Sequence, residues 1–219
     1  MKRTNWFDKK RFVIMMTGIV GIGIFLSFLL EVNYGTDTCA FMNASLSRRF
    51  GISFGTTMVL TNLLFFIPEL IWGRKLIGPG TIANMMLIGY ISDFCRMLEE
   101  TYLPSLIFQD PLFRTLIFLA ALIPFLISVA LYMNADMGQV PYDSIATIIS
   151  ERLHLPFAPV RIFWDCLIIL VGVLAGGHLT IGTVVLAFSI GPAVTVIGKK
   201  NESSLLKRSR CSRQIYARR

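Results

Sequence analysis

The chain has 219 residues, of which 54% are hydrophobic and 12% aromatic, and its mean hydropathy is +0.66. A soluble domain of this length could not bury so much apolar surface, so the composition excludes an ordinary soluble protein and predicts a protein of the lipid bilayer. The formal charge of +8 resides largely at the two ends of the chain, beside apolar runs and without a nucleic-acid-binding motif, so we expect no nucleic-acid partner.

The first half of the chain predicts three membrane spans. Five Lys or Arg residues within residues 1–11 precede an apolar run at 12–30. This run is longer than the apolar core of a signal peptide and no clear cleavage site follows, so we expect a retained helix with a cytoplasmic amino terminus. A polar segment at 34–52 follows, and further spans are expected at about 54–72 and 80–94.

The second half repeats this order. The stretch 95–111 carries three acidic residues and one basic residue, which is typical of a loop on the outer side of the membrane. A second polar segment occupies 137–155, and the basic stretch 199–219 predicts a cytoplasmic tail. The three spans expected in this half lie at about 115–133, 156–175 and 179–197.

The two polar segments match each other when 103 is subtracted from the residue numbers. Gly138 then corresponds to Gly35, Arg152 to Arg49, and Asp165 of the fifth span to Asn62 of the second. Such a correspondence indicates that one unit occurs twice. Because each unit contains an odd number of spans, the second unit would enter the membrane from the opposite side.

We therefore predict an all-α polytopic membrane protein with six transmembrane helices, arranged as two inverted-topology repeats of three. Each repeat includes one short amphipathic or re-entrant helix. Both termini are expected in the cytoplasm, because this arrangement leaves most Lys and Arg inside. If each short helix crossed the membrane instead, the chain would form eight spans in a parallel repeat; that alternative stays open. The expected divisions are 1–11, repeat 1 at 12–98, an outer loop at 99–113, repeat 2 at 114–198, and the tail at 199–219.

Polar side chains within the apolar spans are the candidate solute-binding residues. Arg161 and Asp165 lie four residues apart on the same face of the fifth span, where lipid penalises charge and a functional or paired role is expected. A purely structural ion pair is the open alternative. Asn62, the repeat mate of Asp165, is expected to complete the polar shell of that pair, and Asn84 of the third span is added to the set.

Two further candidates begin the second short helix. Pro141 suits a first helical turn, and Tyr142 and Asp143 follow it directly. Asp143 could cap its helix or contact a solute, since a carboxylate is favourable at that position in either role. The predicted substrate-binding residues are thus Asn62, Asn84, Tyr142, Asp143, Arg161 and Asp165.

Other chemistry has little support in the sequence. His154 and His178 lack the spacing of a metal site, so neither a metal nor another cofactor is expected. No nucleophile with a base and no phosphate-binding loop occurs, which argues against an enzyme and against ATP use. A disulfide between Cys39 and Cys95 stays open, because both fall on the predicted outer side.

The motif at Gly138, Pro141, Tyr142 and Asp143, together with the order of the elements, resembles the YczE/YyaS/YitT family of bacterial integral membrane proteins over about residues 10–198. The chain lacks the soluble carboxy-terminal domain of the longer members and is similar to the short YczE-like type. The resemblance implies a multi-pass protein of the bacterial plasma membrane. It also implies transport, although the family's solutes are not defined.

Two classes of function follow from these patterns. The first is a secondary transporter or permease for a small polar or charged solute, with alternating access around a polar site in the middle of the membrane. The second is a non-transporting scaffold or accessory protein for an exporter or envelope enzyme. Polar residues within an inverted repeat favour the first class. The solute, the coupling ion and homo-oligomer formation stay open.

Overall fold

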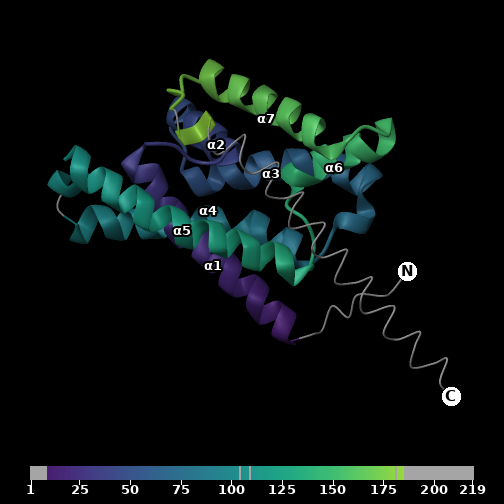
Figure 1. Ribbon diagram of the computed structural model, residues 1–219, viewed down its shortest axis with the longest axis horizontal. Coiled ribbons are helices and arrows are strands. Elements are labelled where there is room, and N and C mark those ends of the chain that lie inside the picture. Colours follow the sequence, from purple (N-terminus) through teal and green to yellow (C-terminus); the bar gives the residue numbers. More distant parts are fainter. Residues whose placement is uncertain (1–8, 104, 109, 181, 185–219) are drawn as a thin grey trace.

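The computed structural model describes residues 9–103, 105–108, 110–180 and 182–184, and these residues form helices and connections without strands. The elements are α1 Lys9–Val32, α2 Thr38–Phe50, α3 Phe54–Trp72, η1 Arg74–Leu76, α4 Pro79–Tyr102, η2 Ser105–Phe108, α5 Pro111–Ala135, α6 Pro141–Leu153 and α7 Phe157–Leu174. The two short 3-10 turns, η1 and η2, flank α4. Figure 1 shows the helices in two stacked groups, with α2, α3, α6 and α7 above α1, α4 and α5.

Four of these helices, α1, α3, α5 and α7, are long and apolar enough to cross a membrane. Helix α4 has a similar length of 24 residues but is more polar, because its second half carries Asp93, Arg96, Glu99 and Glu100. The prediction of an all-α chain with helices suited to a membrane is therefore confirmed for these four helices. Most of the sixth expected span lies outside the described residues, and so does the whole tail at 199–219.

The 103-residue periodicity of the sequence reappears in the backbone. Adding 103 to the bounds of α2 gives the bounds of α6, and the first residues of α3 and α7 are related in the same way. Backbone conformations with positive φ also recur at this spacing, at Asn33 and Asp136, at Gly35 and Gly138, and at Gly51 and His154. The two halves thus share helix register and the conformation of the turns before and after each short helix.

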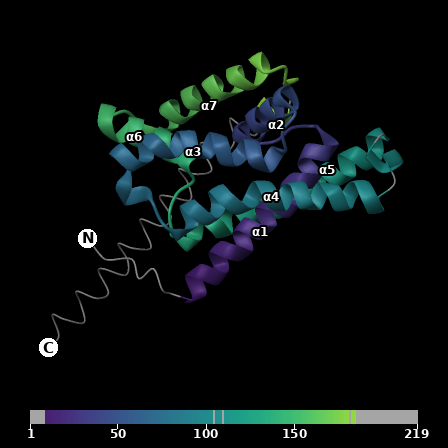
Figure 2. The same ribbon diagram turned by 180° about the vertical axis from the view of Figure 1, so that it is seen from behind.

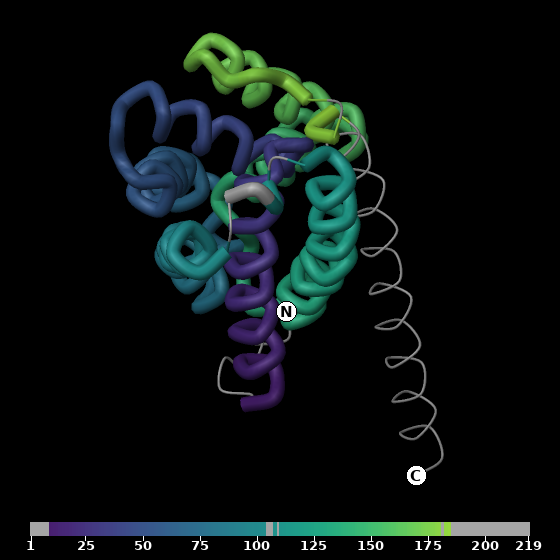
Figure 3. The backbone as a smooth tube through the Cα atoms, turned by 90° about the vertical axis from the view of Figure 1, so that its left-hand side faces the viewer, coloured from purple at the N-terminus to yellow at the C-terminus, as the bar shows by residue number. Residues whose placement is uncertain are grey.

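Helices of the two halves are interleaved. Helix α1 lies beside α5 with the opposite chain direction, and α4 covers another side of α1 (Figures 2 and 3). The short helix α2 packs on α7 of the second half, whereas α6 packs on α3 of the first half. Each short helix therefore joins the long helix of the other half, and the beginnings of α2 and α6 come close to α7.

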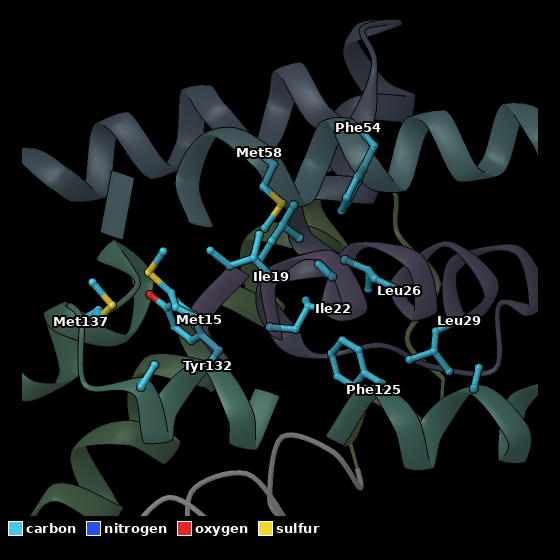
Figure 4. Close-up of a cluster of buried hydrophobic side chains, with 14 residues drawn as sticks. Met15, Ile19, Ile22, Leu26, Leu29, Phe54, Met58, Phe125, Tyr132 and Met137 are labelled. Carbon is cyan, nitrogen blue, oxygen red and sulfur yellow. The ribbon is translucent and has the colours of Figure 1, made fainter. Parts of the chain in front are cut away.

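One face of α1 forms the centre of the apolar core. Met15, Ile19, Ile22, Leu26 and Leu29 recur every three or four residues and are buried against side chains of α3 and α5 (Figure 4). On other faces of α1, glycine residues without side chains allow the neighbouring helices to approach α1 closely. A Cβ atom at Gly18 would lie 2.7 Å from the Tyr132 nitrogen of α5, and one at Gly23 would lie 2.6 Å from Ile91 of α4.

One sequence-based expectation is wrong in detail. The outer loop expected at 99–113 is partly helical, because α4 continues to Tyr102 and α5 begins at Pro111. The extension is held by Glu99, which is buried against α1 and accepts a 2.5 Å hydrogen bond from the Ser27 hydroxyl. Cys39 and Cys95 are both free, so the disulfide left open above is absent.

Candidate functional site

The ion pair predicted on the fifth span is present and is part of a larger network. Arg161 and Asp165 of α7 are 5% and 2% exposed, and Arg161 Nε donates to Asp165 Oδ2 at 3.1 Å. The guanidinium also donates through Nη1 to Asp143 of α6 and lies 4.9 Å from the centre of the Tyr142 ring. One buried cation therefore binds two carboxylates and faces an aromatic ring.

The other oxygen of Asp165 is bound by two hydroxyl groups. Tyr142 donates its hydroxyl proton to Asp165 Oδ1. Thr38 Oγ1 lies 3.0 Å from the same oxygen and 2.6 Å from the Tyr142 hydroxyl. Since Thr38 is the first residue of α2, the first half of the chain contributes directly to the network around Asp165.

The local sequence explains why these groups meet. Pro141 occupies the first turn of α6 and brings Tyr142 and Asp143 to the amino end of that helix. Helix α7 begins at Phe157, so Arg161 lies only about one turn inside it. Amino ends of helices carry partial positive charge, which favours the carboxylates collected there.

Asp37 adds a third carboxylate next to this network. It precedes α2 and caps it by accepting a 3.1 Å hydrogen bond from the Ala40 nitrogen. Asp37 lies in the connection between α1 and α2, outside the spanning helices. Removal of water from its carboxyl group raises its pKa from 3.8 to about 6.

Two further aromatic rings pack around Tyr142. The ring centres of Phe65, Tyr142 and Trp164 lie 5.6 to 6.1 Å apart in tilted and edge-to-face pairs. These rings come from α3, α6 and α7. The orientation of the Tyr142 hydroxyl toward Asp165 is therefore supported by packing between the two halves.

Two cavities meet at Arg161. The central cavity, of about 120 Å³, lies between α1, α3, α4, α5 and the starts of α2 and α6. The α6-side cavity, of about 230 Å³, is lined by residues of η1, the α5–α6 connection and the amino ends of α6 and α7. Tyr132, Met133, Val140, Asp143 and Arg161 line both.

The predicted residues divide into two groups. Tyr142, Asp143, Arg161 and Asp165 form one connected network, and Asp143 binds Arg161 rather than capping α6. Asn62 does not complete the shell of the pair: it is 0% exposed and neither of its amide atoms has a hydrogen-bond partner among the described residues.

Asn84 lies apart from the ion pair but lines the central cavity. Its residue is 2% exposed, and its Oδ1 atom has no partner in the described part of the chain.

Sequence reasoning missed Thr38 and Asp37. Thr38 takes the position expected for Asn62 because α2 packs on α7, a contact between distant parts of the chain. The local signal was the Thr-Asp-Thr sequence at 36–38, which is typical of a helix start but does not reveal what the side chains contact.

Glu69 is a further buried carboxyl group. It lies near the end of α3, yet it is buried between α3 and α6 and accepts a 2.7 Å hydrogen bond from the Ser144 hydroxyl. The remaining oxygen, Oε2, has no partner among the described residues. This interaction is a second polar contact between the halves, distinct from the Arg161 network.

Comparison with known proteins gives a family but no activity. A protein of Haemophilus influenzae, described as an uncharacterized protein, is 26% identical over 183 residues, which cover 83% of this chain and 79% of the relative. No solved structure matches the chain. Neither finding concerns the YczE/YyaS/YitT resemblance, which stays a prediction. The model of the "Family of unknown function (DUF6198)" matches residues 9–199, so the chain belongs to this family.

Proposed function

We propose that this protein is a secondary transporter or permease for a small polar or charged solute, located in a bacterial plasma membrane with both termini in the cytoplasm. The observation that carries the proposal is the Arg161 network beside the central cavity. Charged groups within membrane-spanning helices are costly in lipid and are typical of solute and ion pathways. No enzymatic activity is proposed.

The composition of the network suits a site whose geometry changes during transport. Thr38 comes from the first half of the chain, whereas Tyr142, Arg161 and Asp165 come from the second. A relative movement of the halves would break the contacts to Thr38 and leave Asp165 with fewer donors. A solute could then replace them, which would link binding to the movement.

Two cavities at equivalent positions of the repeat support access from both sides. The α6-side cavity includes Gly138 and Lys75. A smaller cavity, the α2-side cavity, is lined by residues of the end of α1, the α1–α2 connection and α2, and it includes the repeat counterparts Gly35 and His178. The former has a volume of about 230 Å³ and the latter about 20 Å³. In an inverted repeat, exchange of the two conformations would close the large cavity and open the small one.

The six-span arrangement is part of the proposal and has a direct test. Arg49 at the end of α2 and Arg152 at the end of α6 are exposed and are separated by 103 residues. In a background without the native cysteines, Arg49→Cys should react with a membrane-impermeant maleimide only from outside, and Arg152→Cys only from inside. Reaction of both from the same side would instead support the parallel eight-span arrangement.

The function is tested by solute flux in proteoliposomes loaded with mixtures of amino acids, small acids and amines. We expect efflux of at least one class through the wild-type protein. The double variant Arg161→Met with Asp165→Asn should remain folded but lose that flux. A folded and fully active double variant would make the pair purely structural, and absence of flux of every class through folded wild-type protein would favour the scaffold alternative.

A further inference from the structure

The central cavity combines apolar walls with an excess of acidic groups. Ile22, Ile88 and Phe125 contribute to its apolar part, and Asp37, Asp143 and Arg161 contribute charged groups. Arg161 is the single Lys or Arg residue among the described residues that line it. Asp165 contacts Arg161 and places another carboxylate next to the residues that line the cavity.

The single cation is already engaged. Arg161 binds Asp165 through Nε and Asp143 through Nη1. Asp165 is further bound by two hydroxyl groups, whereas Asp37 receives one hydrogen bond, from the backbone of its own helix. The side chain of Asp143 is 39% exposed. The cavity therefore has acceptor capacity and negative charge that its own donors do not balance.

Asn84 provides an independent indication of a ligand. It lines the cavity from α4, a helix that contains none of Asp37, Asp143 and Asp165. Its buried Oδ1 atom lacks a donor among the described residues, and an unpaired buried carbonyl costs free energy unless a ligand or water supplies that donor. Residues with acceptor atoms from three separate elements thus line one small cavity.

We propose that the central cavity binds a small organic cation, with an ammonium group placed between Asp37, Asp143 and Asn84 and a compact apolar body against Ile88 and Phe125. An ammonium group supplies several N–H donors and a positive charge, and these are needed because the one cation of the cavity is already paired. A carboxylate solute would instead meet acidic groups and an arginine that is already paired. This inference rests on the proposed transport function and names its solute class.

Binding can be measured separately from transport. Full-length protein in lipid nanodiscs would be titrated with n-propylammonium, propionate and 1-propanol, three probes of equal chain length but different charge. We expect n-propylammonium alone to give binding heat and to raise the thermal midpoint. Ammonium and n-hexylammonium would be tested as a smaller and a larger cation. Preferential binding of propionate would overturn the assignment, and so would the failure of all three cations to bind at millimolar concentration.

Matched variants locate the ammonium group. Asp37→Asn keeps a helix-capping side chain but removes the charge, and it should weaken n-propylammonium binding by about tenfold or more. Asp110→Asn is the control, because Asp110 caps α5 through the Leu112 nitrogen at 2.8 Å and is exposed. It should leave binding unchanged. Equal affinities of the two variants would contradict the proposed position.

Asn84→Leu gives a second test that does not alter a helix cap or a charge. Loss of one acceptor should weaken binding by about three- to tenfold. Unchanged affinity would remove Asn84 from the site. If n-propylammonium binds but no solute crosses proteoliposomes, the cation site stands and the transport function fails. If another solute is transported and no ammonium probe binds, the transport function stands and the solute class is wrong.

Discussion

Equivalent positions in the two halves of this protein have the same backbone but different chemistry. Helices α2 and α6 have matching bounds, and Gly35 and Gly138 adopt the same unusual φ region. Yet Arg161 and Asp165 of the second half correspond to Met58 and Asn62 of the first. The comparison teaches that the duplicated backbone sets the scaffold, while charges in only one copy create an asymmetric site.

The largest effect is expected when the buried Arg161 of the second half is replaced. Arg161→Met, which introduces the side chain of the repeat mate Met58, leaves the buried Asp165 carboxylate without its ionic partner. We expect a loss of ~3–5 kcal/mol in the free energy of unfolding, measured by denaturant titration in detergent. Adding Asp165→Asn completes the match to the first half and should recover most of the loss. A stable single variant would show that the pair is not needed for folding.

The shared turns predict a graded effect of glycine replacement. Gly35 has φ +146, and a Cβ atom there would lie 2.3 Å from the Thr183 nitrogen, so Gly35→Ala should cost about 2–3 kcal/mol. Gly51 also has positive φ, at +67, but its Cβ would meet no atom within 4 Å. Gly51→Ala should therefore cost only about 1 kcal/mol. Equal losses in thermal unfolding would argue against the close contact at Gly35.

The contact between Glu69 and Ser144 also has no polar counterpart, since its repeat mates are Gly172 and Phe41. Ser144→Ala leaves a buried carboxyl group without its donor and should lower the free energy of unfolding by about 1–3 kcal/mol. The double variant Glu69→Leu with Ser144→Ala replaces both partners by apolar groups and should be more stable than the single variant. The opposite order would indicate that Glu69 has another partner.

The smallest effect is expected at the mouth of the α6-side cavity. Lys75 pairs with Glu151 at 2.7 Å, but the two side chains are 62% and 50% exposed. Solvent and salt screen such pairs, so Lys75→Ala should change the free energy of unfolding by less than about 1 kcal/mol. A much larger change would mean that Lys75 has a structural role beyond this exposed ion pair.

Local patterns in the sequence were sufficient to determine several features of this protein. The 103-residue correspondence predicted matching helices, and the spacing of Arg161 and Asp165 predicted their contact on one helix face. The range 54–72 predicted for the second span coincides with α3. Such features depend on hydrophobic runs, helix periodicity and turn residues, all of which act between neighbours in the chain.

The partners of Asp165 were decided by tertiary structure. The sequence favoured Asn62 by symmetry, but packing of α2 on α7 brings Thr38 to Asp165 instead. In the same way, packing of α6 on α3 buries Glu69, although Glu69 lies near the end of its apolar span. Side chains from distant segments compete for each buried polar atom, and helix periodicity alone does not determine which of them comes within hydrogen-bonding distance.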